Sequence, residues 1–151
     1  MRVAQARQVV RRPREEVFAF HADAANLSRV IPFGLIRTIG PSRLGPGRTV
    51  RVRVGVGKLA ARNAIVVKSW APPHRFVDAQ RYGPFASWEH LHEFVDDGAA
   101  TEVRDRVSFA LVPPLAFLEP LATHAVHAML ALKLRRTARV LDDAPVARSA
   151  A

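Results

Sequence analysis

The sequence contains no cysteine, which excludes disulfide bonds and thiolate metal sites. It also lacks any run of about 18 apolar residues of the kind that crosses a membrane. The first residues, Met1–Arg7, are interrupted by charge and have no apolar core of a secretory signal. We therefore expect a cytoplasmic protein without a membrane span.

Lysine is scarce, so arginine supplies most of the positive charge. Three lysines stand beside 20 arginines, and the formal net charge is +10. The arginines are spread over several predicted elements, which disfavours nucleic acid binding because such surfaces gather their charge on one face. A basic module that contacts an acidic partner stays an alternative.

No glycine-rich phosphate loop, Gly-x-Ser-x-Gly motif or dinucleotide fingerprint occurs, so we expect no cofactor.

The composition is that of a folded protein, with 49% hydrophobic and 24% charged residues in a chain of 151. This length predicts a single domain, which we place at residues 1–143. Residues 144–151 are small and polar, and we expect them to form a disordered tail. The sequence does not indicate the oligomeric state, so a homodimer is left open.

The N-terminal part predicts one strand followed by two short helices. Residues 2–10 have the pattern of a strand. Pro13 suits the first position of a helix, and Glu15 and Glu16 favour its positive end. Asp23 is placed to cap a second helix, which Pro32 ends.

The rest of the chain predicts a sheet and then a long helix. Alternation with a period of two marks strands over 33–39, 49–56, 59–70, 76–82, 87–95 and 101–111. After Pro113 and Pro114, residues 115–141 have a helical pattern, and Pro120 predicts a kink or a start near Glu119. The apolar positions of this helix are spaced by three and four: Leu118, Leu121, Ala122, Ala125, Met129 and Leu132. The plan is α+β, an antiparallel sheet of six to seven strands covered by the helix, with room for a ligand between them.

The candidate site lies on the last three predicted strands. Trp88, His90, His92 and Phe94 share the apolar face of one strand. On the next strand the same face carries Asp105 together with Val103, Val107, Phe109 and Leu111. If Asp97-Gly98 is the turn, His90 lies opposite Asp105; a shift by two residues places His92 there instead.

The preceding strand adds Phe76, Asp78, Gln80 and Tyr82 to the same face. So many polar groups on a core face predict an internal network or a polar-edged cavity. The His–Asp pair is either a structural couple that fixes the register or a histidine held as a proton carrier. His90 and His92 lack a third and fourth metal ligand other than Asp78 or Asp105, so we expect no metal.

Several segments resemble the SRPBCC superfamily, which includes START domains, polyketide cyclases and the birch-pollen allergen. They are Pro13-x-Glu15-Glu16-Val17-Phe18, Trp70-x-Pro72-Pro73-x-Arg75-Phe76-x-Asp78-x-Gln80, Gly83-Pro84-Phe85-x-x-Trp88-x-His90-x-His92-x-Phe94 and Asp105-x-Val107. The resemblance implies a helix-grip fold with a deep pocket between the sheet and the last helix. One departure is Arg12, which stands where a small capping residue is usual.

We expect the pocket to bind a small hydrophobic, aromatic or lipid-like molecule. The alternative is an enzyme of the polyketide cyclase, dehydratase or aromatase type, with a pocket histidine as general acid/base. His90, His92 and Asp105 are the residues for such chemistry. The ligand-binding residues that we predict are Phe76, Asp78, Gln80, Tyr82, Trp88, Phe94, Val107, Phe109, Leu121, Ala125 and Met129.

Overall fold

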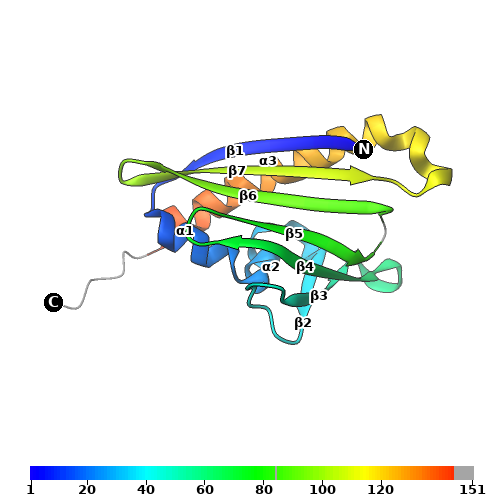
Figure 1. Ribbon diagram of the computed structural model, residues 1–151, viewed down its shortest axis with the longest axis horizontal. Coiled ribbons are helices and arrows are strands. Elements are labelled where there is room, and N and C mark those ends of the chain that lie inside the picture. Colours follow the sequence, from blue (N-terminus) through cyan, green and yellow to red (C-terminus); the bar gives the residue numbers. More distant parts are fainter. Residues whose placement is uncertain (84, 145–151) are drawn as a thin grey trace.

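The computed structural model describes residues 1–83 and 85–144 as a curved sheet closed by a long helix (Figure 1). The helices are α1 (Arg14–His21), α2 (Leu27–Val30) and α3 (Glu119–Asp142). Short 3₁₀ turns cover Ala24–Asn26, Pro32–Gly34, Gly57–Leu59 and Pro113–Leu118. The strands are β1 (Arg2–Val10), β2 (Ile36–Ile39), β3 (Thr49–Val54), β4 (Ala61–Ala71), β5 (Arg75–Tyr82), β6 (Ser87–Asp97) and β7 (Ala100–Ala110). Of the tail expected over 144–151, all but Ala144 lies outside the described residues.

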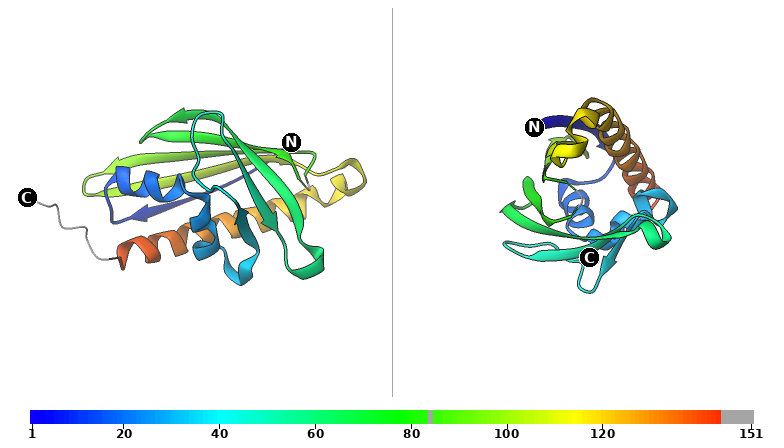
Figure 2. Two further views of the ribbon diagram at one scale, coloured as in Figure 1. Left: turned by 90° about the horizontal axis from the view of Figure 1, so that it is seen from below. Right: turned by 90° about the vertical axis from the view of Figure 1, so that its right-hand side faces the viewer.

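The strands form one antiparallel sheet in the order β1-β7-β6-β5-β4-β3-β2. The end-on view in Figure 2 shows that the sheet curls and that α3 lies across its open side. The predicted α+β plan is therefore confirmed: a seven-stranded antiparallel sheet grips a long C-terminal helix, and short helices follow the first strand.

Two apolar clusters lie on the concave side of the sheet. In the first, the Phe18 ring of α1 packs edge-on against Trp70, Phe76 and Phe94, with ring centroids 5.1, 5.7 and 5.4 Å away. In the second, buried residues of α3 pack against buried residues of β1 and β7: Ala4, Val107, Phe109, Val126 and Leu130. The polar cluster described below lies between these two apolar regions.

Two strands are shorter than predicted by two residues or more. β2 begins only at Ile36, because Phe33 and Gly34 have φ angles of 62° and 63° and turn the chain in the left-handed region. β3 ends at Val54, because Gly55 has a φ of 110°. A Cβ on Gly55 would lie 3.0 Å from the Cα of Ala60, so only glycine fits where the two strands turn.

Helix α3 begins at Glu119, as Pro120 at the first turn predicted, but its buried face differs from the prediction. That face carries Val126, Leu130, Lys133, Leu134, Thr137 and Ala138, whereas Leu121 is 70% exposed. By length and composition alone, the helical segment Pro113–Asp142 could cross a membrane. In the structure α3 lies along the sheet and buries a lysine on its inner face, which is the position of a covering helix.

Arg12 anchors the far end of α3. Its side chain is only 6% exposed, and it donates hydrogen bonds to the carbonyl oxygens of Leu141 (2.7 Å) and Ala144. A guanidinium at this position neutralises the negative end of the helix dipole and satisfies carbonyls that have no helical partner. The cap of α1 is Pro13, which makes no side-chain capping bond. Arg12 therefore lies one residue before the cap, not at the capping position predicted from the sequence, and its side chain holds α3.

Candidate functional site

Three neighbouring strands bring the polar residues of the site into register. Asp78 of β5 lies opposite His90 of β6, and His92 of β6 lies opposite Asp105 of β7. The register is the second of the two alternatives, because Asp97 pairs with Ala100 and the turn is Gly98-Ala99. Gly98, with a φ of 65°, takes the first central position, where hairpin turns need a positive φ.

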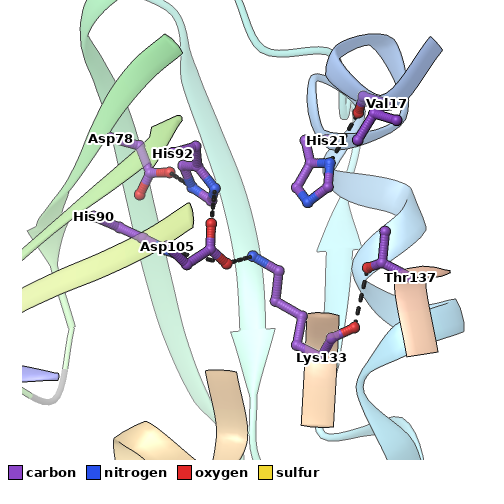
Figure 3. Close-up of polar contacts among 8 residues, drawn as sticks. All are labelled: Val17, His21, Asp78, His90, His92, Asp105, Lys133 and Thr137. Carbon is purple, nitrogen blue, oxygen red and sulfur yellow. Dashed lines mark hydrogen bonds and ion pairs between the residues drawn. The ribbon is translucent and has the colours of Figure 1, made fainter. Parts of the chain in front are cut away.

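His92 lies between two buried carboxylates (Figure 3). Its Nε2 is 3.0 Å from Oδ2 of Asp78, in hydrogen-bonding geometry. Its Nδ1 is 3.0 Å from Oδ1 of Asp105, although these two atoms are not aligned for a hydrogen bond. On the other side, Nζ of Lys133 in α3 donates to Oδ2 of Asp105 over 2.6 Å. The four side chains form a continuous chain from the sheet to the helix, which we call the buried cluster.

The two carboxylates of the buried cluster favour a protonated His92. Each ring nitrogen faces a carboxylate oxygen, and only the imidazolium carries hydrogen on both nitrogens. Burial opposes this charge, but Asp105 and Asp78 outweigh it and raise the pKa of His92 above its usual value. Burial likewise opposes the charge of Asp105, yet the Lys133 ammonium and His92 hold the pKa of that carboxyl well below its usual range. Burial also opposes the charge of Asp78, but its hydrogen bond to His92 and the charges of His92 and Lys133 together lower the pKa of this carboxyl.

The charges of the buried cluster therefore sum to zero. Two carboxylates are balanced by one ammonium and one imidazolium. Such balance is what burial of four ionised groups requires, because an uncompensated charge inside a protein is strongly destabilising. A fifth charge would disturb this balance, so the cluster fits a neutral ligand group better than an ion.

Two further imidazoles beside the buried cluster are neutral. The His90 ring lies against His92 with 3.7 Å between centroids and the ring planes tilted by 33°, and its Nε2 is 3.5 Å from Oδ2 of Asp105. Burial and the charge of His92 lower the pKa of His90 to about 4. His21 donates from Nδ1 to the Val17 carbonyl over 2.9 Å. Burial and the charge of Lys133 lower the pKa of His21 to about 3.

The buried cluster forms one wall of a cavity of about 250 Å³ between the sheet, α2 and α3, which is partly open to solvent. The other walls are mostly apolar. They are formed by Phe20, Ala24, Leu27, Val30, Ile31, Ile36, Leu44, Val52, Val54, Ile65, Phe76, Phe85, Trp88, Val126, Met129 and Leu130. Polar groups enter from His21, Asp23, Asn26, Asn63, Asp78, His90, His92, Lys133 and Thr137.

The structure places six of the predicted site residues in the cavity wall: Phe76, Asp78, Trp88, His90, His92 and Met129. Asp105 lies directly behind them and is 1% exposed. Phe94, Val107 and Phe109 are buried in the apolar clusters instead of facing the cavity. Gln80 lies outside it too, because its side chain bonds to both backbone groups of Phe85.

Three predicted ligand-binding residues point away from the cavity. Leu121 and Ala125 lie on the exposed face of α3. Tyr82 is 47% exposed, because Arg81 has no partner in β4: Gln80 pairs with Ile65 and Tyr82 with Ala64. This extra residue is a β-bulge, and it moves Tyr82 to the outer face of the sheet.

Two residues of the site, Lys133 and His21, were not predicted from the sequence. The signal for Lys133 was its spacing, since Val126, Leu130, Lys133 and Thr137 recur every three or four residues. A lysine on the buried face of a helix needs a buried acid as a partner, and the strand pattern predicts Asp105 on the inner face of the sheet. His21 ends α1, and only the packing of that helix brings its ring to 6.0 Å from the His92 ring.

Asp78, His90 and His92 offer ligand atoms that all lie within 4.8 Å of one another, close enough to hold a metal ion. His92 already bonds to Asp78 through one of these atoms. A metal ion would have to displace the proton of His92, because metal ligands must be deprotonated. Since the cluster is neutral with that proton in place, its charge balance favours the proton.

Comparison with known proteins gives matches to solved structures only. No protein-family model and no curated protein matches the sequence. A START superfamily protein from Mycobacterium smegmatis superposes with a TM-score of 0.76 at 14% identity, over 93% of this chain and 97% of that one. The Thermus thermophilus protein TTHA0849 gives 0.74 at 17% identity, over 93% and 97%.

A third match is the di-domain aromatase/cyclase BexL of the BE-7585A biosynthetic pathway. Its TM-score is 0.70 at 17% identity, over 95% of this chain, which spans 48% of BexL. Identities this low establish the fold alone. The helix α3 held across a seven-stranded sheet, the short helices after β1 and these superpositions together show that the chain has a helix-grip fold, which it shares with these three structures.

Proposed function

We propose that this protein binds a small, flat, mostly apolar molecule of one or two fused rings, with a neutral polar group directed at the buried cluster. The observation that carries this proposal is the cavity itself, which is largely apolar and has one polar wall. Ligand sites combine these two features: apolar walls supply affinity, and a few fixed polar groups set the orientation.

The size of the cavity supports a ligand of this class. An apolar cavity of about 150 Å³ holds a benzene molecule. The cavity here measures about 250 Å³, which has room for a second ring. Trp88 and Phe76, which line it, offer the flat faces on which rings stack.

A cyclase, dehydratase or aromatase activity is the second candidate. It is favoured by the contact between neutral His90 and protonated His92, because a general acid and a general base would then lie side by side. The similarity in fold to an aromatase/cyclase agrees with this candidate. The substrate would have to place only a ring-sized part in the cavity.

Native mass spectrometry of the protein, purified without denaturant from the cells that express it, tests the first candidate. We expect a mass increment that matches a neutral one- or two-ring compound and that disappears after denaturation. Repeated purification of the protein without any such increment, together with no binding of added ring compounds, would contradict it. Turnover that is lost in both His90→Gln and His92→Gln would support the enzyme instead.

A further inference from the structure

The positive charge of the chain is concentrated in one segment. Residues 24–77 contain no aspartate or glutamate and ten basic residues, whereas the rest of the chain has thirteen basic and thirteen acidic residues. The ten are Arg29, Arg37, Arg43, Arg48, Arg51, Arg53, Lys58, Arg62, Lys68 and Arg75. This segment forms β2, β3 and β4, at the opposite edge of the sheet from β1 (Figure 1).

Three arginines of this segment lie side by side on the outer face of the sheet. Arg37 of β2 pairs with Arg53 of β3, and Arg53 pairs with Arg62 of β4. We call them the arginine row. All three are exposed, and none forms an ion pair with another described residue. Like charges placed directly opposite one another destabilise a sheet, so folding does not explain the row.

Beside the row, apolar side chains stand in solvent. Phe33 is 86% exposed, Leu59 is 92% exposed and Val56 is 58% exposed. Leu35 joins them, because its carbonyl accepts a hydrogen bond of 2.8 Å from the Gly55 amide. We call these four residues the apolar tip. Ile36 and Val54, the first pair of the β2–β3 ladder, separate the tip from the arginine row.

Phe33 has a strained backbone conformation, and its ring is exposed to solvent. Its φ of 62° is a left-handed conformation that bulky residues rarely adopt. Strained residues of this kind cluster at functional sites. An exposed aromatic ring held by a strained backbone indicates that the ring meets something outside the molecule.

We propose that the apolar tip and the arginine row dock this protein onto an anionic lipid surface. The tip would enter the acyl boundary, and the guanidinium groups would contact lipid phosphates. Binding of this kind scales with the apolar area inserted plus the attraction of basic residues to anionic lipids. Nucleic acid offers phosphates for the row but no apolar phase for Leu59 and Val56.

The position of the tip links this surface to the cavity. Ile31 and Ile36, which bracket Phe33 and Leu35 in the chain, both line the cavity, and so does Val54. Docking by the tip would therefore hold the cavity close to the lipid surface. The proposal does not depend on the proposed function, because lipid binding can be measured with an empty or a filled cavity.

Co-sedimentation with vesicles tests the proposal. One set is phosphatidylcholine alone, and the other contains phosphatidylglycerol as the minority lipid. We expect the protein to bind the anionic set and to be released at about 1 M salt, where charges are screened beyond about 3 Å. Arg53→Gln/Arg62→Gln should weaken binding about 30-fold, or about fivefold for each charge. Phe33→Ser/Leu59→Ser should weaken it at least tenfold.

Matched variants on α3 and the turn before it serve as controls. Phe117→Ser/Leu121→Ser removes side chains that are 76% and 70% exposed, and Arg135→Gln/Arg139→Gln removes two exposed charges. Neither pair should change binding, and no variant should unfold below the wild-type temperature. No binding to anionic vesicles, a loss caused by the α3 variants, or no effect of Phe33→Ser/Leu59→Ser would each overturn the proposal.

Discussion

Lys133 and Asp105 form an ion pair of 2.6 Å that joins α3 to β7, and their side chains are 5% and 0% exposed. The pair holds the C-terminal helix against the sheet by charge at the point where the cavity interrupts apolar packing. It also completes the charge balance around His92. The stability of the fold and the state of the site therefore depend on the same contact.

Lys133→Met should destabilise the protein by about 3–5 kcal/mol, because it leaves two buried carboxylates with one imidazolium. Urea unfolding measures the loss as a lower midpoint with an unchanged slope. Lys133→Met/Asp105→Asn removes both partners and should recover most of the stability. An equal loss in the single and double variants would show that lost packing, and not the unpaired carboxylate, is the cause.

The histidines predict how stability depends on pH. His90 and His21 have pKa values lowered to about 4 and about 3, so they bind protons more tightly in the unfolded chain. Stability should therefore fall as the pH drops below about 6.5, before the carboxylates titrate. For His92 the pKa is raised, so its contribution is complete below about 6.5 and is lost as the pH rises through its folded value.

Denaturant midpoints measured from pH 4 to 9 test these signs, and NMR titration of the imidazoles assigns them. His90→Gln should remove on the order of 2–3 kcal/mol of the loss between about pH 6.5 and pH 4. A His92 resonance that reports a neutral ring at pH 7 would contradict the charge balance of the buried cluster.

Arg12→Ala should destabilise the protein by about 2–3 kcal/mol, because it removes charged hydrogen bonds from the carbonyls at the end of α3. Arg11→Ala is the matched control. Arg11 also contacts the end of α3, with Nε 3.2 Å from Oδ2 of Asp142, but its side chain is 80% exposed. Its loss should cost less than about 1 kcal/mol. Equal shifts in the two unfolding temperatures would refute the anchoring role of Arg12.

Much of this fold could be predicted from the sequence, because alternation along the strands and proline at the helix ends are local signals. The inner face of β6 follows from Trp88, His90, His92 and Phe94 alone. The register between β6 and β7 was predicted only within two residues. The register depends on whether Gly98 is the first or the second residue of the two-residue turn. In the structure Gly98 is the first, with a positive φ, and the sequence pattern does not distinguish these two positions.

Features that depend on packing between distant segments could not be predicted in this way. The bulge at Arg81 reverses Tyr82, yet the strand alternates without interruption in the sequence. The buried face of α3 was predicted wrongly because apolar residues occur on both of its faces. The arginine row was also missed, since it appears only when three strands pair.

The central claim is that the cavity accepts a ring-sized guest, and calorimetric titration with 2-naphthol tests it most directly. Met129→Trp places a larger side chain in the cavity wall, whereas Leu132→Trp adds the same side chain to the exposed part of α3. We expect the wild type and Leu132→Trp to bind 2-naphthol equally and Met129→Trp to bind at least tenfold more weakly. Absence of binding to the wild type, or equal binding by all three proteins, would contradict the account.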